Sequence, residues 1–191
     1  MAFVRNHSGL RALKSLITRP VWRDNIKVVW LYGPTGRGKS HLLATLARAP
    51  GVDAYWKPSG PWFEGYTGEP YIFMDDFRAG DMQFSDLLKL CDKFPLRIPI
   101  KGSSAWVEAD KIFITTPQQP EITYNEHEDI GQLMRRIDYI INVEELNVYE
   151  FKKGQVENFI QDFPETAELL APQDEVQDMD EGSQAVPIEL I

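Results

Sequence analysis

Cysteine is almost absent from this sequence of 191 residues, and the single one, Cys91, excludes an internal disulfide. Its helical spacing with Phe84, Leu87 and Leu88 predicts a buried thiol on the apolar face of a helix. No apolar run approaches the roughly 18 residues that a membrane-spanning helix needs, and the N-terminus lacks the apolar core of a signal peptide. We therefore expect a protein of a reducing, intracellular compartment with no membrane partner.

Basic residues are missing from the end of the chain. After residue 160 there are nine acids and no Lys or Arg, which leaves 20 acids and 20 bases in the first 160 residues. The net charge of −9 thus belongs to the C-terminal part, and bulk charge gives no support for nucleic-acid binding by the rest. Because the apolar pattern also fades there, we expect residues 164–191 to form an acidic, disordered tail.

Short apolar segments alternate with segments of helical periodicity. The apolar segments predict buried strands at 28–32, 53–57, 71–74, 111–115 and 137–143, and helical spacing predicts helices at 9–19, 39–49, 83–94 and 129–136. This alternation is typical of an α/β domain with a central, mainly parallel sheet flanked by helices. Residues 96–100 and 105–108, joined by the polar turn KGSS, predict a separate β-hairpin.

Residues 33–40, GPTGRGKS, match the phosphate-binding pattern G-x-x-x-x-G-K-S between a predicted strand and a predicted helix. The glycines let backbone N–H groups turn toward the β-phosphate of a nucleotide, and the following helix adds its positive end. Lys39 would reach the β- and γ-phosphates, and the Ser40 hydroxyl would ligate Mg²⁺. We therefore predict an ATP site with Mg²⁺, formed by Gly33, Pro34, Thr35, Gly36, Arg37, Gly38, Lys39, Ser40 and His41.

The strand at 71–74 ends in two carboxylates at the same edge of the predicted sheet. We assign Asp75 to Mg²⁺, together with Ser40, and Asp76 to activation of the attacking water. The polar run Thr115-Thr116-Pro117-Gln118 follows another strand, and one of its side chains could contact the γ-phosphate or hold the water. A simple turn or helix-capping threonine remains the alternative there.

Two arginines, Arg135 and Arg136, precede the last predicted strand. An arginine supplied by a neighbouring subunit can stabilise charge that develops on the γ-phosphate. The alternative is a solvated basic pair. Around these motifs we divide the chain into a helical lead-in (1–27), a P-loop ATPase domain (28–146), a short C-terminal extension (147–163) and the acidic tail (164–191).

Taken in order, these motifs resemble one family. The segments FVRNHSGL, GPTGRGKS, YWKPSGPWFEGYTGE, YIFMDDF, LLKLCDKFPLRIPIKG, KIFITTP and LMRRID are similar to the helicase domain of replication-initiator (Rep) proteins of circovirus-like viruses. This is a superfamily-three helicase domain of the AAA+ type. The resemblance covers residues 3–143 and implies an ATP-driven motor that works as a hexameric ring on single-stranded DNA during rolling-circle replication in the host nucleus.

The resemblance also assigns roles to positions. It implies that Lys101, Gly102 and Ser103, at the tip of the hairpin, grip single-stranded DNA, and that Arg135 or Arg136 reaches the ATP of the neighbouring subunit. The strand end at 115–118 would be the sensor motif, but Pro117 stands where that family carries an asparagine. We therefore assign the sensor role to Thr116, with Gln118, or no sensor at all, as alternatives.

A second departure concerns the nicking endonuclease that precedes the helicase in full-length family members. That domain needs a histidine pair and a tyrosine nucleophile, whereas the histidines His7, His41 and His127 form no H-x-H pair. Tyr149-x-x-Lys152 mimics the nucleophile motif, and without metal ligands we interpret it as a chance match. We therefore expect no nickase in this chain, which would be either an excised helicase domain or a short natural product.

Three functions remain open at this point: a DNA helicase motor, a non-enzymatic nucleotide-binding regulatory module, and another P-loop enzyme such as a small-molecule kinase. Pro117 is compatible with weakened hydrolysis and hence with the regulatory module. No segment resembles the arginine-bearing lid or the second substrate pocket of a kinase. ATP turnover with and without single-stranded DNA would separate the three.

Overall fold

The computed structural model of the chain describes residues 19–124, 127–145, 148–151 and 155–167. The predicted helix at 9–19, except for its last residue, lies outside these ranges, and so does the predicted tail from residue 168 onward. None of the described helices is long and apolar enough to cross a membrane.

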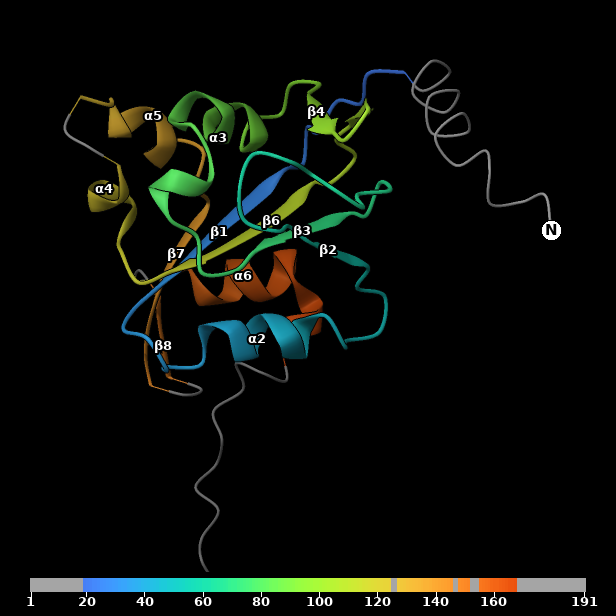
Figure 1. Ribbon diagram of the computed structural model, residues 1–191. Helices are drawn as coiled ribbons and strands as arrows, with labels where there is room; N and C mark the ends of the chain where they lie inside the picture. The colour runs from blue at the N-terminus through green and yellow to red at the C-terminus, as the bar shows by residue number, and fades with distance from the viewer. Residues whose placement is uncertain (1–18, 125–126, 146–147, 152–154, 168–191) are drawn as a thin grey trace, which may run out of the picture.

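Six strands form the central sheet in the order β2-β3-β6-β1-β7-β8. All neighbouring pairs are parallel except β7 and β8, which are antiparallel. The prediction of a mainly parallel sheet flanked by helices is therefore confirmed (Figure 1). The strands are β1 (Lys27–Tyr32), β2 (Ala54–Trp56), β3 (Tyr71–Met74), β6 (Lys111–Thr116), β7 (Tyr139–Glu145) and β8 (Val148–Phe151).

The inner strands are continuous apolar runs because both faces of the sheet are covered. In β1, residues 28–31 are fully buried, and alternate side chains enter two different cores. One core packs against α2 (Lys39–Leu46) and α6 (Val156–Asp162), which lie together on one face of the sheet in Figure 1. The other core packs against α3 (Phe84–Leu90) and α5 (Ile130–Met134) on the opposite face.

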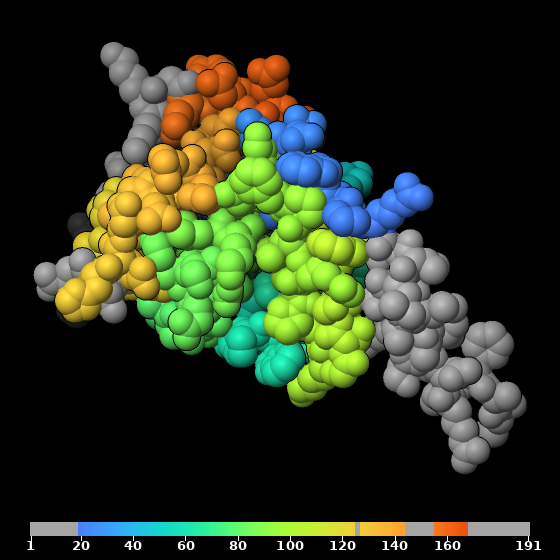
Figure 2. Space-filling model, turned by 90° about the horizontal axis from the view of Figure 1, so that it is seen from above, coloured from blue at the N-terminus to red at the C-terminus, as the bar shows by residue number. Residues whose placement is uncertain are grey.

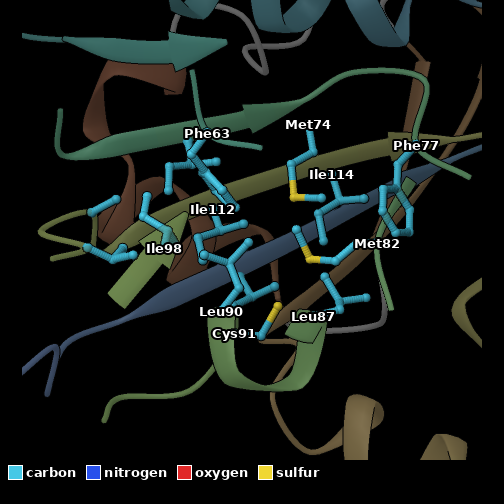
Figure 3. Close-up of a cluster of buried hydrophobic side chains, with 14 of the residues drawn as sticks. Phe63, Met74, Phe77, Met82, Leu87, Leu90, Cys91, Ile98, Ile112 and Ile114 are labelled. Atoms are coloured by element: carbon cyan, nitrogen blue, oxygen red, sulfur yellow. The ribbon is translucent and has the colours of Figure 1, made fainter. Parts of the chain in front are cut away.

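Figure 3 shows this second core, in which side chains of β3 and β6 meet those of α3. Cys91 belongs to it, and only 2% of its surface is exposed. Burial raises the pKa of its thiol to about 12, so that the thiolate is disfavoured at neutral pH. The prediction of a buried core cysteine is confirmed.

The predicted hairpin exists, with slightly different bounds. It consists of β4 (Arg97–Ile100) and β5 (Ser103–Trp106), and Ile100 pairs with Ser103, so that the turn is only Lys101-Gly102. Gly102 has a φ of 75°, a left-handed conformation that glycine adopts without strain. The polar residues Ser103 and Ser104 suggested a longer turn, but they belong to the strand. Figure 2 shows the hairpin beside α3 on one face of the molecule.

Two short elements lie between the strands and helices near the C-terminal edge of the sheet. These are η2 (Ala79–Asp81) and α4 (Pro120–Thr123), and neither was predicted. Toward the C-terminus, η3 (Pro164–Thr166) follows α6 and lies inside the segment that we expected to be a tail. Thr166 is 1% exposed and the Tyr71 hydroxyl donates to Glu165, so the packed part of the chain reaches at least residue 166.

Candidate functional site

Glycine is required where strand β1 turns into the phosphate-binding loop. Gly33 has a φ of 143°, and a Cβ at this position would lie 2.3 Å from the carbonyl oxygen of Val143 in the neighbouring strand. Gly38 has a φ of 91° and is the N-cap residue of helix α2. Both fixed glycine positions of the predicted loop pattern thus have structural reasons to be glycine. The loop residues Pro34, Thr35, Gly36 and Arg37 are exposed, as is His41 in the first turn of α2.

Lys39 points back into the loop. Its Nζ donates hydrogen bonds to the carbonyl oxygens of Gly33 and Pro34, each at 2.7 Å, and the residue is 8% exposed. Burial lowers the pKa of the ammonium, while the carboxylate of Asp76 acts in the opposite direction. A compact cation is therefore held against the loop by carbonyl groups rather than by a tight ion pair, and it can interact with phosphate oxygens.

One carboxylate oxygen of Asp75 links Ser40, which follows the P-loop, to Thr115 at the end of β6. Asp75 Oδ1 accepts hydrogen bonds from Ser40 Oγ at 2.7 Å and from Thr115 Oγ1 at 2.6 Å. The strand order explains this convergence, because β6 lies between β1, which leads into the loop, and β3, which ends before the acid. Thr115 Oγ1 also accepts from the backbone N–H of Asp76 at 2.9 Å.

The two threonines at the end of β6 have different contacts. Thr116, which we assigned from the sequence, is fully buried, and its Oγ1 accepts from the backbone N–H of Gln118 at 3.3 Å. That is the turn-forming role which the sequence left as the alternative. Successive side chains of a strand point to opposite faces, so only one of the two threonines can face Asp75. The structure identifies Thr115 as that residue.

The donor set suits Mg²⁺ with a nucleotide. A hydroxyl and a carboxylate, Ser40 and Asp75, lie 2.7 Å apart beside a glycine loop whose first position would be blocked by any Cβ. Within the described residues there is no group of three or more His, Cys, Asp or Glu side chains that could hold a metal by themselves. Mg²⁺ commonly uses one or two protein oxygens and completes its shell with phosphates and water. The residues present therefore fit such a site.

Asp76 differs from Asp75 in exposure, backbone conformation and side-chain partner. It is exposed, and its φ of 53° makes it the one non-glycine residue with a positive φ among the described positions. Its carboxylate forms an ion pair with Arg78, with 2.8 Å between Oδ1 and Nη1. A left-handed aspartate at a strand end is an unusual conformation of the kind found at functional sites. The sequence analysis assigned Asp76 a catalytic role but missed Arg78, which stands two residues away.

The two arginines lie at the other edge of the sheet. β7 runs parallel to β1, and Val29 is paired with Tyr139, so that residues just before β7 lie near the start of β1. The P-loop follows the other end of β1, at about 3.3 Å per strand residue. Arg135 and Arg136 therefore lie roughly one strand length from the P-loop of their own chain.

Arg136 is engaged within the chain, whereas Arg135 is exposed. The Arg136 guanidinium donates from Nε and Nη2 to Asp92 Oδ2, at 2.9 and 2.6 Å, and from Nη1 to the Gln132 carbonyl at 2.6 Å. This ion pair fixes the start of β7 to the segment after α3. The geometry favours Arg135 as the side chain that can reach a neighbouring subunit.

The hairpin presents basic groups on the same side of the molecule as α3. Lys101 is exposed at the turn, beside Gly102 and Ser103, and its backbone N–H donates to Glu64 Oε2 at 3.3 Å. Arg97 stacks over the Trp106 ring at 5.3 Å. Ile98 and Ile100 point into the core and anchor the hairpin. In Figure 1 the hairpin and the P-loop, which immediately precedes α2, lie at opposite ends of the sheet.

Two buried cations were missed by the sequence analysis. Arg23 is 2% exposed and donates to carbonyl oxygens around the end of α3, including Leu90 at 2.7 Å, and so stabilises that helix end. Lys57 is 8% exposed, donates to the carbonyls of Pro58 and Gly60, and lies beside Asp75 in a small hollow. Burial lowers the pKa of both groups. The position of Lys57 directly after a strand was the only available signal.

Comparison with known proteins agrees with this geometry. The family described as RNA helicase matches residues 29–118, which run from β1 past Thr115. The replication-associated protein of goose circovirus is 35% identical over 134 residues, covering 70% of this chain and 44% of that protein. That of beak and feather disease virus is 34% identical over 146 residues (75% and 49%), and that of porcine circovirus 1 is 38% identical over 127 residues (65% and 40%).

The chain spans about half the length, or less, of these curated relatives. The resemblance inferred from the motifs is confirmed, and the matched region contains the P-loop, Asp75 and Thr115 together. By sequence and by fold, the chain belongs with the helicase domain of circovirus-type replication-associated proteins.

Proposed function

We propose that the chain is an ATP-driven DNA helicase motor that moves along single-stranded DNA as a ring, in the setting of viral rolling-circle replication in a host nucleus. The observation that carries the proposal is the convergence of Ser40 and Thr115 on one oxygen of Asp75 beside the P-loop. The similarity to replication-associated proteins supports DNA as the track.

Different residues of the chain would bind the phosphates, hold Mg²⁺ and accept the proton from the attacking water. The P-loop backbone and Lys39 bind and orient the phosphates, and Ser40 with Asp75 would hold Mg²⁺, which neutralises charge on the β- and γ-phosphates. Thr115 fixes the orientation of Asp75 and, through the Asp76 N–H, the backbone of the second acid. Asp76 accepts a proton from the attacking water at its exposed carboxylate.

Assembly is part of the proposal because the site is incomplete in one chain. Arg135 is exposed at the edge of the sheet opposite the P-loop, so it can act only on the nucleotide of another copy. A ring in which each subunit supplies Arg135 to its neighbour completes every site, and it brings the hairpin tips around one strand of DNA. Each Lys101 would then bind a phosphate without regard to base identity.

A regulatory module without activity is the second candidate, since Pro117 replaces a polar side chain at the strand end. The retention of Lys39, Asp75, Asp76 and the Thr115 contact favours hydrolysis. The test is ATP turnover with and without single-stranded DNA, compared with Lys39→Ala and Asp75→Asn.

For the motor we expect turnover that DNA stimulates and that falls at least about a hundredfold in Lys39→Ala, the scale of losing one preorganised charge partner. Asp75→Asn should cost comparable activity and weaken the dependence on Mg²⁺. Nucleotide binding without turnover would support the regulatory module instead. Turnover stimulated only by a small acceptor molecule would indicate a kinase.

A further inference from the structure

The Arg78 guanidinium contacts the exposed acid of the site, Asp76. A single nitrogen, Nη1, forms the ion pair with Asp76 Oδ1 and also donates to the carbonyl oxygens of Asp76 and Phe77, each at 3.0 Å. Within the described part of the chain, its Nε and Nη2 form no hydrogen bond. The edge of the planar donor group that carries Nε and Nη2 is therefore available for another anion.

The backbone around Arg78 is fixed, so that only its side chain can move easily. The Arg78 N–H donates to Asp81 Oδ2 at 2.8 Å, and the Asp81 N–H donates back to the Arg78 carbonyl at 2.9 Å. The Phe77 N–H donates to the Thr115 carbonyl at 2.7 Å, which pins the turn to the end of β6. The side chain itself is 44% exposed, and that of Asp76 is 70% exposed.

The exposed ion pair between Arg78 and Asp76 can be replaced at low cost by a contact between Arg78 and another anion. Ion pairs at such exposure contribute little free energy, because solvent screens them and ordering the side chains costs entropy. A phosphate group has more charge than a carboxylate and offers three oxygens to a guanidinium, which binds it in a bidentate manner. A triphosphate in the P-loop would therefore compete well for Arg78.

Arg78 is connected to the phosphate site through Asp76. The Asp76 N–H donates to Thr115 Oγ1 at 2.9 Å, and Thr115 Oγ1 donates to the same Asp75 oxygen that accepts from Ser40. Lys39 is the residue that would contact the γ-phosphate. Lys39 and Ser40 are consecutive residues at the start of α2, so this series of contacts leads from Arg78 to the residues that would bind the phosphates.

We propose that Arg78 recognises the γ-phosphate: when a nucleoside triphosphate is bound, its guanidinium moves from Asp76 to the γ-phosphate oxygens and leaves the Asp76 carboxylate free to accept a proton from water. The proposal rests on the nucleotide site of the proposed function, but not on DNA binding or translocation. It makes Arg78 a residue that distinguishes triphosphate from diphosphate within one chain.

The test compares equilibrium binding of ADP and of a non-hydrolysable ATP analogue, both with Mg²⁺, so that no turnover is needed. Arg78→Gln should weaken analogue binding by about ten- to a hundredfold, since losing one charge-assisted contact costs about 1.5–3 kcal/mol and 1.4 kcal/mol is a factor of ten. ADP affinity should change by less than about twofold. Arg78→Lys should retain part of the preference, and Arg48→Gln, an exposed arginine after helix α2, is the charge-matched control.

A second measurement tests the exchange itself. Asp76→Asn removes the competing partner, so it should tighten analogue binding more when Arg78 is present than in the Arg78→Gln background. Equal effects in both backgrounds would overturn the exchange. Equal losses of ADP and analogue in Arg78→Gln, or no loss of either, would overturn γ-phosphate recognition. If the parent chain binds neither nucleotide, the proposed function fails as a whole, whereas an unchanged preference in a chain that binds both rejects Arg78 alone.

Discussion

At the scale of single residues, the site depends on which of two adjacent threonines meets the acid. The spacing of the P-loop pattern and the position of Asp75 after an apolar strand were enough to assign Ser40 and Asp75 to one Mg²⁺ site, and the two side chains are hydrogen-bonded to each other. The choice between Thr115 and Thr116 depends on the face of β6 that turns toward β3, and the apolar pattern of a strand buried on both faces does not reveal it. Asp76 was predictable as an acid, but its left-handed backbone and its pairing with Arg78 were not.

Thr115→Val tests that assignment. Valine keeps the shape of the side chain but removes the donor to Asp75 and the acceptor for the Asp76 N–H. We expect turnover to fall by about tenfold, which corresponds to about 1.4 kcal/mol in the barrier. Thr116→Val is the matched comparison, and the thermal midpoints of both variants separate a loss of stability from a loss of catalysis. A larger loss of turnover in Thr116→Val would return the sensor role to Thr116.

At the scale of elements, the strands and the helices around the loop were predictable because each is either a continuous apolar run or a segment of clear helical spacing. The boundaries of the hairpin were not, since Ser103 and Ser104 are typical turn residues. Only their pairing with Ile100 and Pro99 places them in a strand. Strand β8 and helix α4 have four residues each and are too short to show a period. Their place is set by neighbours that are distant in sequence.

The hairpin should bind DNA through its tip. Lys101→Ala removes an exposed cation from the turn, so we expect weaker binding to single-stranded DNA and a shallower dependence of log affinity on log salt, because fewer counterions are released. Arg48→Ala, which removes one charge near α2 on the other face of the sheet, is the control. Affinity across a salt series is the measurement. An unchanged slope would mean that Lys101 is only a turn residue and that the strand of DNA runs elsewhere.

Helix α6 should be attached to the sheet in a pH-dependent way. Burial would raise the pKa of Asp162, but hydrogen bonds from Lys27 and Tyr139 outweigh burial and lower it. An acid with a lowered pKa stabilises the fold above its unfolded pKa of about 4 and loses this contribution as the pH falls. Asp162→Asn should therefore cost about 1 kcal/mol at pH 7 and progressively less below pH 4.

Chemical unfolding at several pH values measures that difference. Glu157→Gln, which neutralises an exposed acid of the same helix, is the control and should have little effect at any pH. A cost for Asp162→Asn that stays constant from pH 7 to pH 3 would contradict the role of its ionised carboxylate.

At the scale of the whole molecule, the nucleotide site and the exposed Arg135 lie at opposite edges of one sheet. We therefore expect specific ATPase activity to rise with protein concentration. An Arg135→Ala chain mixed with a Lys39→Ala chain should recover part of the turnover, because some mixed interfaces combine an intact P-loop with an intact arginine. Arg136→Ala should instead lower stability, because it leaves Asp92 without its partner.

Turnover measured over a dilution series, beside a measurement of molecular mass, tests the assembly. Specific activity that stays constant down to demonstrably monomeric protein would show that one chain contains a complete site.

The position of β6 has a mechanical consequence. β6 follows the hairpin after a short connection and ends at Thr115 and Thr116. It is paired along its whole length with β1 and along most of it with β3. The strand therefore cannot stretch or shift its register without breaking hydrogen bonds to both neighbours. The short connection before it is also held, because the Tyr66 hydroxyl accepts from the N–H groups of Glu108 and Ala109, and Asp110 donates to Pro70. In the proposed motor, a displacement of the hairpin tip would therefore be transmitted along β6 to Thr115 and, through it, to the carboxylate of Asp75. Strand β6 would couple DNA movement to ATP hydrolysis through the middle of the sheet.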